Sequence, residues 1–342
     1  MDLSPVTMEE QVADIAVETN KEPIDTHVDE STGVAETKKE PNVEMITICG
    51  KQFPIDTTDL DLSNMKLTAV PEEIKSFRNL YWLKLSDNNI ETIDESSFEG
   101  LYNLHFLMLE KNKLKAIPKN AFKDLYNLHI LYLSQNEIAH VDQDAFFNLA
   151  SLKSLFLSGN KLESFENNTF IHMPHLELLN LNNNLLTLQN NVFEGLSNLK
   201  TLYLAMNKLT SISEYFFASL NNLTTLGLNF NNITSIEPLS FKNLGYLKNL
   251  TLYKNEDLVT LPDDMFENLV NLEYLDIMPT NLTSIPHSIL NCTGLKYFCH
   301  DDKIVSDGVF EAVLKMVAQN NEAGSPRKQT EQTGNSEVES DN

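Results

Sequence analysis

The sequence has few cysteines, few basic residues and no long apolar run. Its three cysteines are an odd number, which excludes a closed disulfide framework. No apolar run approaches the roughly 18 residues that a membrane-spanning helix needs, and residues 1–20 lack the basic and apolar regions of a signal peptide. The 25 basic residues face 49 acidic ones, and the net charge of −24 makes nucleic acids and anionic membranes poor partners. We therefore expect a cytoplasmic protein without membrane insertion.

Most of the chain consists of one sequence unit of about 24 residues that is repeated many times. Leucines, an asparagine and a phenylalanine return at fixed positions, in the pattern L-x-x-L-x-L-x-x-N-x-L with the phenylalanine further on. Full units begin at Leu80, Leu104, Leu128, Leu152, Leu176, Leu199, Leu223, Leu247 and Leu272. Such self-similarity indicates a stack of coils, in which the terminal units depart from the pattern because each has only one neighbour.

The unit predicts one short strand and two buried columns. Its L-x-L core alternates inward and outward and is too short for a helix, so we expect a strand, stacked parallel about 4.8 Å from the next. The asparagines should turn inward and satisfy backbone groups of the bend after each strand. They are Asn88, Asn112, Asn136, Asn160, Asn184, Asn207, Asn231 and Asn255. The phenylalanines, from Phe98 to Phe266, should stack along the far side of the core.

A 24-residue period with a phenylalanine column resembles the typical leucine-rich repeat of animal secreted and receptor proteins, such as Slit-like proteins, small leucine-rich proteoglycans and Toll-like receptor ectodomains. The resemblance covers residues 50–298. It implies an α/β-type solenoid: a curved right-handed superhelix with a parallel sheet on its concave face and short 3₁₀ and turn segments on its convex face. It also implies protein or ligand binding and seldom catalysis. We expect no enzymatic activity, cofactor or metal.

Paired cysteines flank the repeats in that class, whereas this chain carries only Cys49, Cys292 and Cys299. Cys49 lies about ten strand spacings from the other two, too far for a disulfide. Cys292 stands where other repeats carry leucine and is best explained as a small core residue. The cysteines thus favour the cytoplasm over the extracellular space.

Composition divides the chain into three parts. Residues 1–44 carry twelve acids and three lysines, a charge of −9, and should form a disordered acidic tail. The repeat domain should span residues 45–319, from a cap strand to a capping helix over 307–319, with Ser306 as its N-cap. The apolar face of that helix is Val309, Phe310, Val313, Leu314 and Val317. Residues 320–342 should form a disordered polar tail.

Three patterns could carry chemistry, and each has a simpler explanation. His105 and His129 occupy the same position in neighbouring repeats, but no third ligand column accompanies them. Cys299-His300-Asp301 matches the C-x-D motif of bacterial ubiquitin ligases with leucine-rich repeats, yet those enzymes surround it with a large helical domain. The six N-x-S/T sequons are about as many as chance gives in so asparagine-rich a chain. No Gly-rich phosphate loop or nucleophile elbow is present.

The surface predicted to act is the concave face, because side chains that flank the L-x-L leucines point there. The expected partner-binding residues are Trp82, Lys84, Phe106, Met108, Ile130, Tyr132, Phe156 and Tyr203. All of them except Lys84 and Tyr203 should form one continuous exposed apolar patch, which soluble monomers rarely display without use. A single aromatic at such a position is also simply a good strand residue, but Trp82 beside Phe106 and Met108 favours binding.

The leading hypothesis is a non-enzymatic adaptor, monomeric when alone, that holds a protein partner on its concave face. The alternative is a secreted or cell-surface recognition protein of the extracellular leucine-rich repeat class, which binds a ligand or matrix.

Overall fold

The structure is a computed structural model that describes residues 43–278, 280–300, 304 and 308–324. The chain divides into two units, Met1–Asn42 and Val43–Asn342, and every described residue belongs to the second. The predicted acidic tail therefore lies outside the described residues except for its last two, and Ser306, Asp301 and residues 325–342 also lie outside them.

An antiparallel hairpin begins the second unit. Strands β1 (Met45–Ile48) and β2 (Lys51–Pro54) pair so that Ile46 lies opposite Phe53. The turn between them holds Cys49 and Gly50, both with positive φ. Ile48 is buried in the core of the first coils, as expected of the predicted cap strand, and β2 returns beside it.

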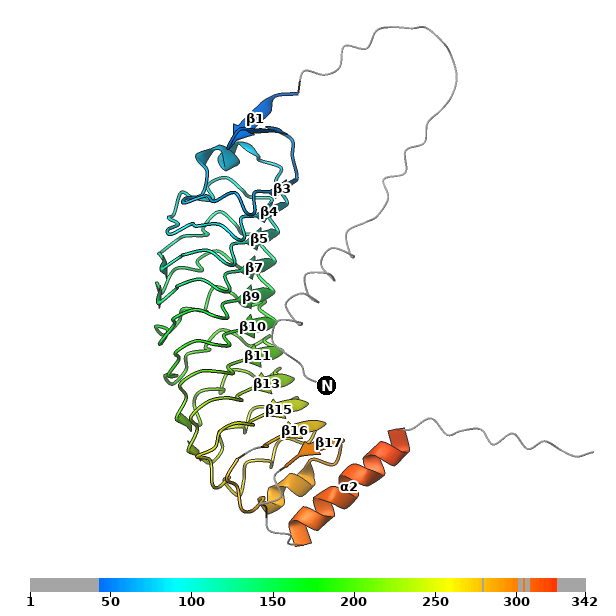
Figure 1. Ribbon diagram of the computed structural model, residues 1–342. Helices are drawn as coiled ribbons and strands as arrows, with labels where there is room; N and C mark the ends of the chain where they lie inside the picture. The colour runs from blue at the N-terminus through cyan, green and yellow to red at the C-terminus, as the bar shows by residue number, and fades with distance from the viewer. Residues whose placement is uncertain (1–42, 279, 301–303, 305–307, 325–342) are drawn as a thin grey trace, which may run out of the picture. The chain divides into compact units, whose positions relative to one another are not determined.

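A parallel sheet of eleven strands follows, with one strand from each coil and the strands in chain order. Figure 1 shows this sheet along the inner, concave side of the curved row of coils. The strands are β3 (Asp59–Asp61), β4 (Trp82–Lys84), β5 (Phe106–Met108), β7 (Ile130–Tyr132), β9 (Ser154–Phe156), β10 (Leu178–Asn180), β11 (Thr201–Tyr203), β13 (Thr225–Gly227), β15 (Asn249–Thr251), β16 (Tyr274–Asp276) and β17 (Tyr297–Cys299). The predicted parallel-sheet solenoid is confirmed.

The core is built from the repeated apolar positions. The central residues of neighbouring strands lie in register, as with Leu83 and Leu107, and both of these leucines are fully buried. Rings of the phenylalanine column stack coil on coil, with centroids 5.9 Å apart for Phe98 and Phe122 and 6.4 Å apart for Phe122 and Phe146. Each coil thus covers the apolar side of the next, which is why no coil is complete alone.

In the coils that the structure describes, the convex side carries short elements only. They are the 3₁₀ helices η1 (Glu72–Ser76) and η2 (His287–Asn291) and two pairs of short strands, β6 (Ala116–Ile117) with β8 (His140–Val141) and β12 (Ser211–Ile212) with β14 (Ser235–Ile236). Turns connect them. These segments agree with the expectation of 3₁₀ and turn structure on this side.

The repeated asparagines tie each coil to the one before it. Asn136 donates from Nδ2 to the carbonyl oxygens of Leu109 and Leu133, at 2.9 and 3.1 Å. Its Oδ1 accepts from the backbone N–H of Leu114, at 3.0 Å. The same bonds recur along the column, from Asn88 to Asn255. One side chain therefore satisfies buried backbone groups that the bend after the strand leaves without partners.

Helix α2 (Gly308–Gly324) closes the stack by packing against η2 and β17. Phe310 and Val313 are buried, but Leu314 is 40% exposed, so its predicted place on the packed face is wrong. Met316, one turn after Val313 on the packed side, joins Val309 and Val317 against the core instead. Among the residues that the structure describes, none of the helices has the length and apolar character needed to cross a bilayer.

The predicted helix end at residue 319 is also wrong, because α2 continues to Gly324. Asn320 donates from Nδ2 to the carbonyl oxygens of Thr293 and Leu295, and Asn321 donates to Lys296. These polar residues hold the last turns of α2 against the final coil by hydrogen bonds, a form of docking that an apolar pattern does not reveal.

Val313→Asp should undock α2 and loosen the last coil. The Val313 side chain is completely buried, and an unpaired carboxylate in its place costs several kcal/mol. Amide hydrogen exchange in residues 295–299 should rise well above the wild-type rate. Leu314→Asp is the matched control, since that neighbouring side chain is exposed, and it should exchange at nearly the wild-type rate. Equal exchange in both variants would contradict this role of α2.

Candidate partner-binding surface

Each strand of the large sheet presents two side chains on the concave face. In β4 and β5 the central leucine is buried, and the residues on either side of it are half-buried on the opposite face. The parallel register places Trp82, Phe106 and Ile130 in one row. It places Lys84 and Met108 in a second row, two residues further along the strands. Trp82, Phe106, Met108 and Ile130 are called the front cluster below.

The front cluster gathers apolar side chains from three adjacent strands. All four residues are half-buried, as are Lys84 and, three strands beyond β7 in sheet order, Tyr203. Trp82 is the only tryptophan of the chain. Backbone hydrogen bonds between neighbouring strands fix the backbone that carries these side chains, so little backbone entropy remains to be lost when a partner covers them.

Tyr132 and Phe156 do not extend this surface as predicted. They are only 5% and 2% exposed, so the expectation of one continuous exposed apolar patch is wrong at its centre. Their rings stack with centroids 4.6 Å apart and planes inclined by 7°. Neighbouring parallel strands bring in-register rings face to face, and each ring therefore covers the other. Neither residue belongs to the leucine core.

Glu110 is a concave-face residue that sequence reasoning missed. It follows β5 by two residues, and its Oε1 accepts a hydrogen bond from Ser86 Oγ at 2.6 Å. Its other oxygen, Oε2, is buried and has no hydrogen-bond partner within the described residues. Burial raises the pKa of the Glu110 carboxyl, an effect that the Ser86 hydrogen bond and the charge of Lys84 offset in part. The sequence signal that could have revealed it is an acid at a repeat position where the coils on both sides carry serine, Ser86 and Ser134.

Glu110→Gln should stabilise the fold at pH 7 and have a smaller effect at pH 4. A carboxyl whose pKa is raised by folding contributes stability below its unfolded pKa, near 4.5, and loses that contribution as the pH rises through the folded value. Glutamine keeps an oxygen for Ser86 and carries no charge to desolvate. Denaturant midpoints at the two pH values measure the difference, with Glu194→Gln at an exposed position as control. A variant less stable than the wild type at pH 7 would show that ionised Glu110 supports the fold.

Comparisons with known proteins identify the repeat. The sequence model of the leucine-rich repeat matches residues 78–138, 126–186, 182–233 and 221–282. The chain belongs to the leucine-rich repeat family. A comparison with the curated proteins finds no match.

Solved leucine-rich repeat structures share the fold. Toll of Drosophila, in its glycosylated complex with Spatzle, is 24% identical with a TM-score of 0.66, over 73% of this chain and 34% of Toll. An internalin of Listeria monocytogenes, InlF, is 24% identical with a TM-score of 0.63, over 79% and 75% of the two chains. TLR13, in complex with ssRNA13, is 26% identical with a TM-score of 0.50, over 70% and 42%. The chain thus spans about a third of Toll and three quarters of the internalin.

Beside the concave strands, the repeats place Tyr81, His105 and His129 in one column of stacked rings. The ring centroids are 4.2 Å apart for Tyr81 and His105 and 4.9 Å apart for the two histidines. Each histidine Nδ1 lies 2.7 Å from a backbone oxygen, of Asn103 or Asn127. Burial lowers the pKa of His129, and the charges of His105 and Lys153 lower it further. In the described coils, no group of three or more metal-ligating side chains includes these histidines.

The three cysteines of this leucine-rich repeat chain are all free thiols. Cys292 lies in the core, where burial raises its pKa to about 12, as expected for a small apolar residue. Cys299, at the end of β17, has a pKa raised first by burial and then by the negative charge of Asp276. A nucleophilic thiol needs the opposite shift, so the site does not favour the thiol chemistry of the C-x-D ligases.

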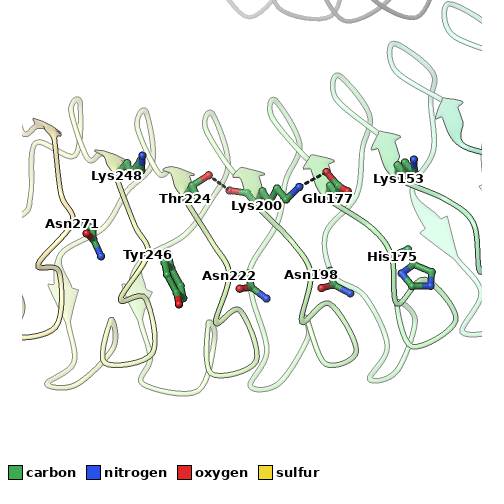
Figure 2. Close-up of a pocket in the computed structure, with 10 residues that line it drawn as sticks. All are labelled: Lys153, His175, Glu177, Asn198, Lys200, Asn222, Thr224, Tyr246, Lys248 and Asn271. Atoms are coloured by element: carbon green, nitrogen blue, oxygen red, sulfur yellow. Dashed lines mark hydrogen bonds and ion pairs between the residues drawn. The ribbon is translucent and has the colours of Figure 1, made fainter. Parts of the chain in front are cut away.

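A groove of about 770 Å³ runs beside the strands of the middle repeats (Figure 2), and sequence reasoning missed it. Five of its residues come directly before a strand of the large sheet, and five end the preceding turns. The lining is Lys153, His175, Glu177, Asn198, Lys200, Asn222, Thr224, Tyr246, Lys248 and Asn271. A second asparagine column builds its floor: Nδ2 of Asn198 and Nδ2 of Asn222 donate to the carbonyl oxygens of Pro174 and Ser197, both at 2.8 Å.

Two of the three lysines in the groove form ion pairs, one with a glutamate of the groove and one with a glutamate outside its lining. Lys200 Nζ lies 2.7 Å from Glu177, and Lys248 lies 3.5 Å from Glu273. Lys153 has no ion pair in the described part of the chain. The groove is therefore weakly positive and lacks the adjoining apolar anchors of the front cluster. The groove could have been found in the sequence from its lysines. Lys153, Lys200 and Lys248 stand directly before the strand in every second repeat.

Proposed function

We propose that this leucine-rich repeat chain is a non-catalytic adaptor that binds a protein partner on its concave face through the front cluster. The observation that carries the proposal is the presence of Trp82, Phe106 and Ile130 in one row of adjacent strands, half-exposed on the same face. Lys84 and Met108 complete the contact area, and Tyr203 lies at its far end. Tyr132 and Phe156 lie beside Met108 in the same row and stack on each other.

Physical chemistry favours this surface over others. Large aromatic side chains near the centre of an interface contribute most of its binding energy, and contiguous apolar surface on a monomer marks a contact site. The solved Toll structure is a complex with Spatzle, whereas the TLR13 structure contains an RNA. With a net charge of −24, the present chain is suited to a protein and not to a polyanion. The exposed free thiol of Cys49 suits the reducing cytoplasm.

Site-specific photo-crosslinking tests the proposal. A photoreactive phenylalanine analogue replaces Phe106 in one variant and Phe147, which is exposed outside the sheet, in another. After irradiation in a cell extract, the Phe106 variant should give one adduct of defined mass that the Phe147 variant does not give. Adducts from both positions alike, or from Phe147 alone, would refute a concave-face site.

A second candidate function, a secreted or cell-surface recognition protein, is favoured by one observation. The six sequon asparagines all have exposed side chains, as N-glycosylation requires. They are Asn167, Asn222, Asn232, Asn249, Asn281 and Asn291. If this function is correct, the chain recovered from its native source carries glycans that an N-glycosidase removes. A single unmodified mass would exclude it in favour of the cytoplasmic adaptor.

A further inference from the structure

A column of alternating charge runs along one wall of the groove. Its seven residues stand directly before the strands of consecutive coils and are called the charged column: Lys153, Glu177, Lys200, Thr224, Lys248, Glu273 and Lys296. From Glu177 to Lys296, each backbone N–H donates to the carbonyl oxygen of the column residue before it, at 2.8 Å. The backbone therefore holds neighbouring members about 4.8 Å apart. Opposite charges adjoin at every coil boundary of the column except the two at Thr224.

The lysines on either side of Thr224 form their ion pairs on the sides away from it. Lys200 Nζ lies 2.7 Å from Glu177, and Figure 2 shows the Lys200 side chain reaching toward that glutamate. Lys248 Nζ lies 3.5 Å from Glu273. The two lysine side chains are 57% and 55% exposed, so a ligand can reach both ammonium groups. Thr224 is the one uncharged member of the column, and it separates these two cations.

Both lysines can turn toward Thr224 without leaving a glutamate unpaired. Glu273 is shared with Lys296, whose Nζ is 2.6 Å away. Glu177 has Lys153 on its other side in the column, and Lys153 forms no ion pair within the described coils. Exposed ion pairs are weak because water competes for both charges. An anion placed between the two lysines can therefore recruit them both.

We infer that the gap at Thr224 binds a phosphoryl group carried by a linear peptide segment, at a site separate from the front cluster. The charged column holds four lysines and two glutamates, an excess of two positive charges. A phosphoryl group carries about −1.5 to −2 at pH 7, whereas one carboxylate neutralises only half of that excess. Lys200 and Lys248 lie two strand spacings apart, about 9.6 Å between Cα atoms. Their flexible side chains can converge on one anion and donate to its oxygens.

The groove suits a peptide better than a free anion. It extends over the five coils from Lys153 to Lys248, about 19 Å at four strand spacings, which matches roughly six residues of extended chain at about 3.3 Å each. Asn198 and Asn222 lie alongside the charged column (Figure 2), and both side chains are exposed. Their Nδ2 atoms hold carbonyl oxygens of the chain. An asparagine used in this way keeps its amide oxygen as an acceptor for a peptide N–H.

The net charge of −24 is compatible with this site. Charges further away than a Debye length, about 8 Å at physiological ionic strength, are largely screened. The acids closest to the gap, Glu177 and Glu273, are neutralised by lysines of the column. A single phosphoryl group therefore meets a locally positive surface, whereas a polyanion extends beyond the column to the acidic remainder of the chain.

A phosphopeptide library tests the site. The full chain is expressed in bacteria, so that the sequon at Asn222 carries no glycan. It is presented with seven-residue peptides whose central residue is phosphoserine, phosphothreonine or phosphotyrosine and whose other positions are random. Parallel libraries carry the unphosphorylated residue or glutamate at the centre. The selected peptides are titrated against the wild type, Lys200→Gln, Lys248→Gln and Thr224→Glu, and against the controls Thr224→Gln and Lys161→Gln.

The controls are matched to the variants. Lys161 pairs with Glu137 at 2.8 Å outside the groove, and this pair has the same exposure as Lys200 and Glu177, 57% and 43%. Thr224→Glu supplies the acid that the charged column lacks, whereas Thr224→Gln adds a similar side chain without a charge. Because Thr224→Glu places an acid between two lysines, its thermal midpoint should rise above that of the wild type. A lower midpoint would show that the column accepts no anion there and would overturn the gap.

The selected phosphopeptides should bind at least tenfold more weakly to Lys200→Gln, Lys248→Gln and Thr224→Glu, and within twofold of the wild type to both controls. Glutamate peptides that bind as tightly as the phosphopeptides would overturn the assignment of a phosphoryl group. Competition by inorganic phosphate at concentrations as low as those of the peptide would overturn the peptide as its source. A phosphorylated library without binders, or binders insensitive to all three variants, would overturn the site itself.

Discussion

Replacing Trp82 and Phe106 together by alanine should weaken partner binding about a thousandfold and leave the fold intact. Buried aromatic anchors at interfaces contribute about 2 kcal/mol or more each, and every 1.4 kcal/mol is a factor of ten in affinity. Both side chains lie on the concave face and outside the leucine core. Their loss therefore removes contact area without opening a cavity between coils. Titration calorimetry with the partner that photo-crosslinking identifies measures the loss of affinity. Circular dichroism checks that the variant is folded.

Tyr102 and Tyr126 supply the matched control. Their rings stack 5.7 Å apart, both are more than 40% exposed, and they lie in turns away from the strands. Tyr102→Ala with Tyr126→Ala removes two exposed aromatic rings from neighbouring coils, as the concave double variant does, and should bind with nearly wild-type affinity. If this control lost affinity and the concave variant did not, the contact surface would lie on the turns.

Asn136→Ala should lower the free energy of unfolding by about 4 kcal/mol. Alanine leaves the carbonyl oxygens of Leu109 and Leu133 and the N–H of Leu114 without the partner that Asn136 now provides. Each buried group left in this way costs about 1–3 kcal/mol. The loss should be local at first, because coils of a solenoid contact only their neighbours. Hydrogen exchange and urea denaturation measure it.

Asn221 is the control for that substitution, since it is exposed and the structure describes no hydrogen bond of its side chain. Asn221→Ala should keep the wild-type midpoint within experimental error. An equally small effect of Asn136→Ala would contradict the prediction. Water would then replace the Asn136 amide in the bend, and the asparagine column would not hold the coils together.

The fold could be predicted because a period of 24 residues places equivalent residues of successive coils next to each other. A strand of three residues can only repeat by stacking parallel to its copy, and the leucines on either side of Met108 or Tyr132 must then face the same core. The stacked phenylalanines follow from the same period. Helix α2 was predicted from its apolar spacing, but its end depends on hydrogen bonds from Asn320 and Asn321, which have no periodic signal.

The candidate site was only partly predictable, because the repeat specifies which way a side chain points and not what covers it. Tyr132 and Phe156 point to the concave face as a strand requires, yet they bury each other by stacking. Glu110 was not predicted because it lies two residues beyond the end of β5, outside the strand positions that the repeat pattern marks as concave. Its importance comes from burial and from an oxygen without a donor in the described coils, and neither can be read from the sequence.

The central claim is that the partner binds the concave face. Hydroxyl-radical footprinting of the chain, alone and with the partner that photo-crosslinking identifies, tests this claim most directly. Trp82, Phe106 and Met108 are reactive residue types at the surface of β4 and β5, and partner binding should reduce their modification severalfold. Tyr102, Tyr126 and Tyr246, which are exposed outside the sheet, should react as before. Protection of these tyrosines with unchanged modification of Trp82 and Met108 would contradict the assignment of the concave face as the binding surface.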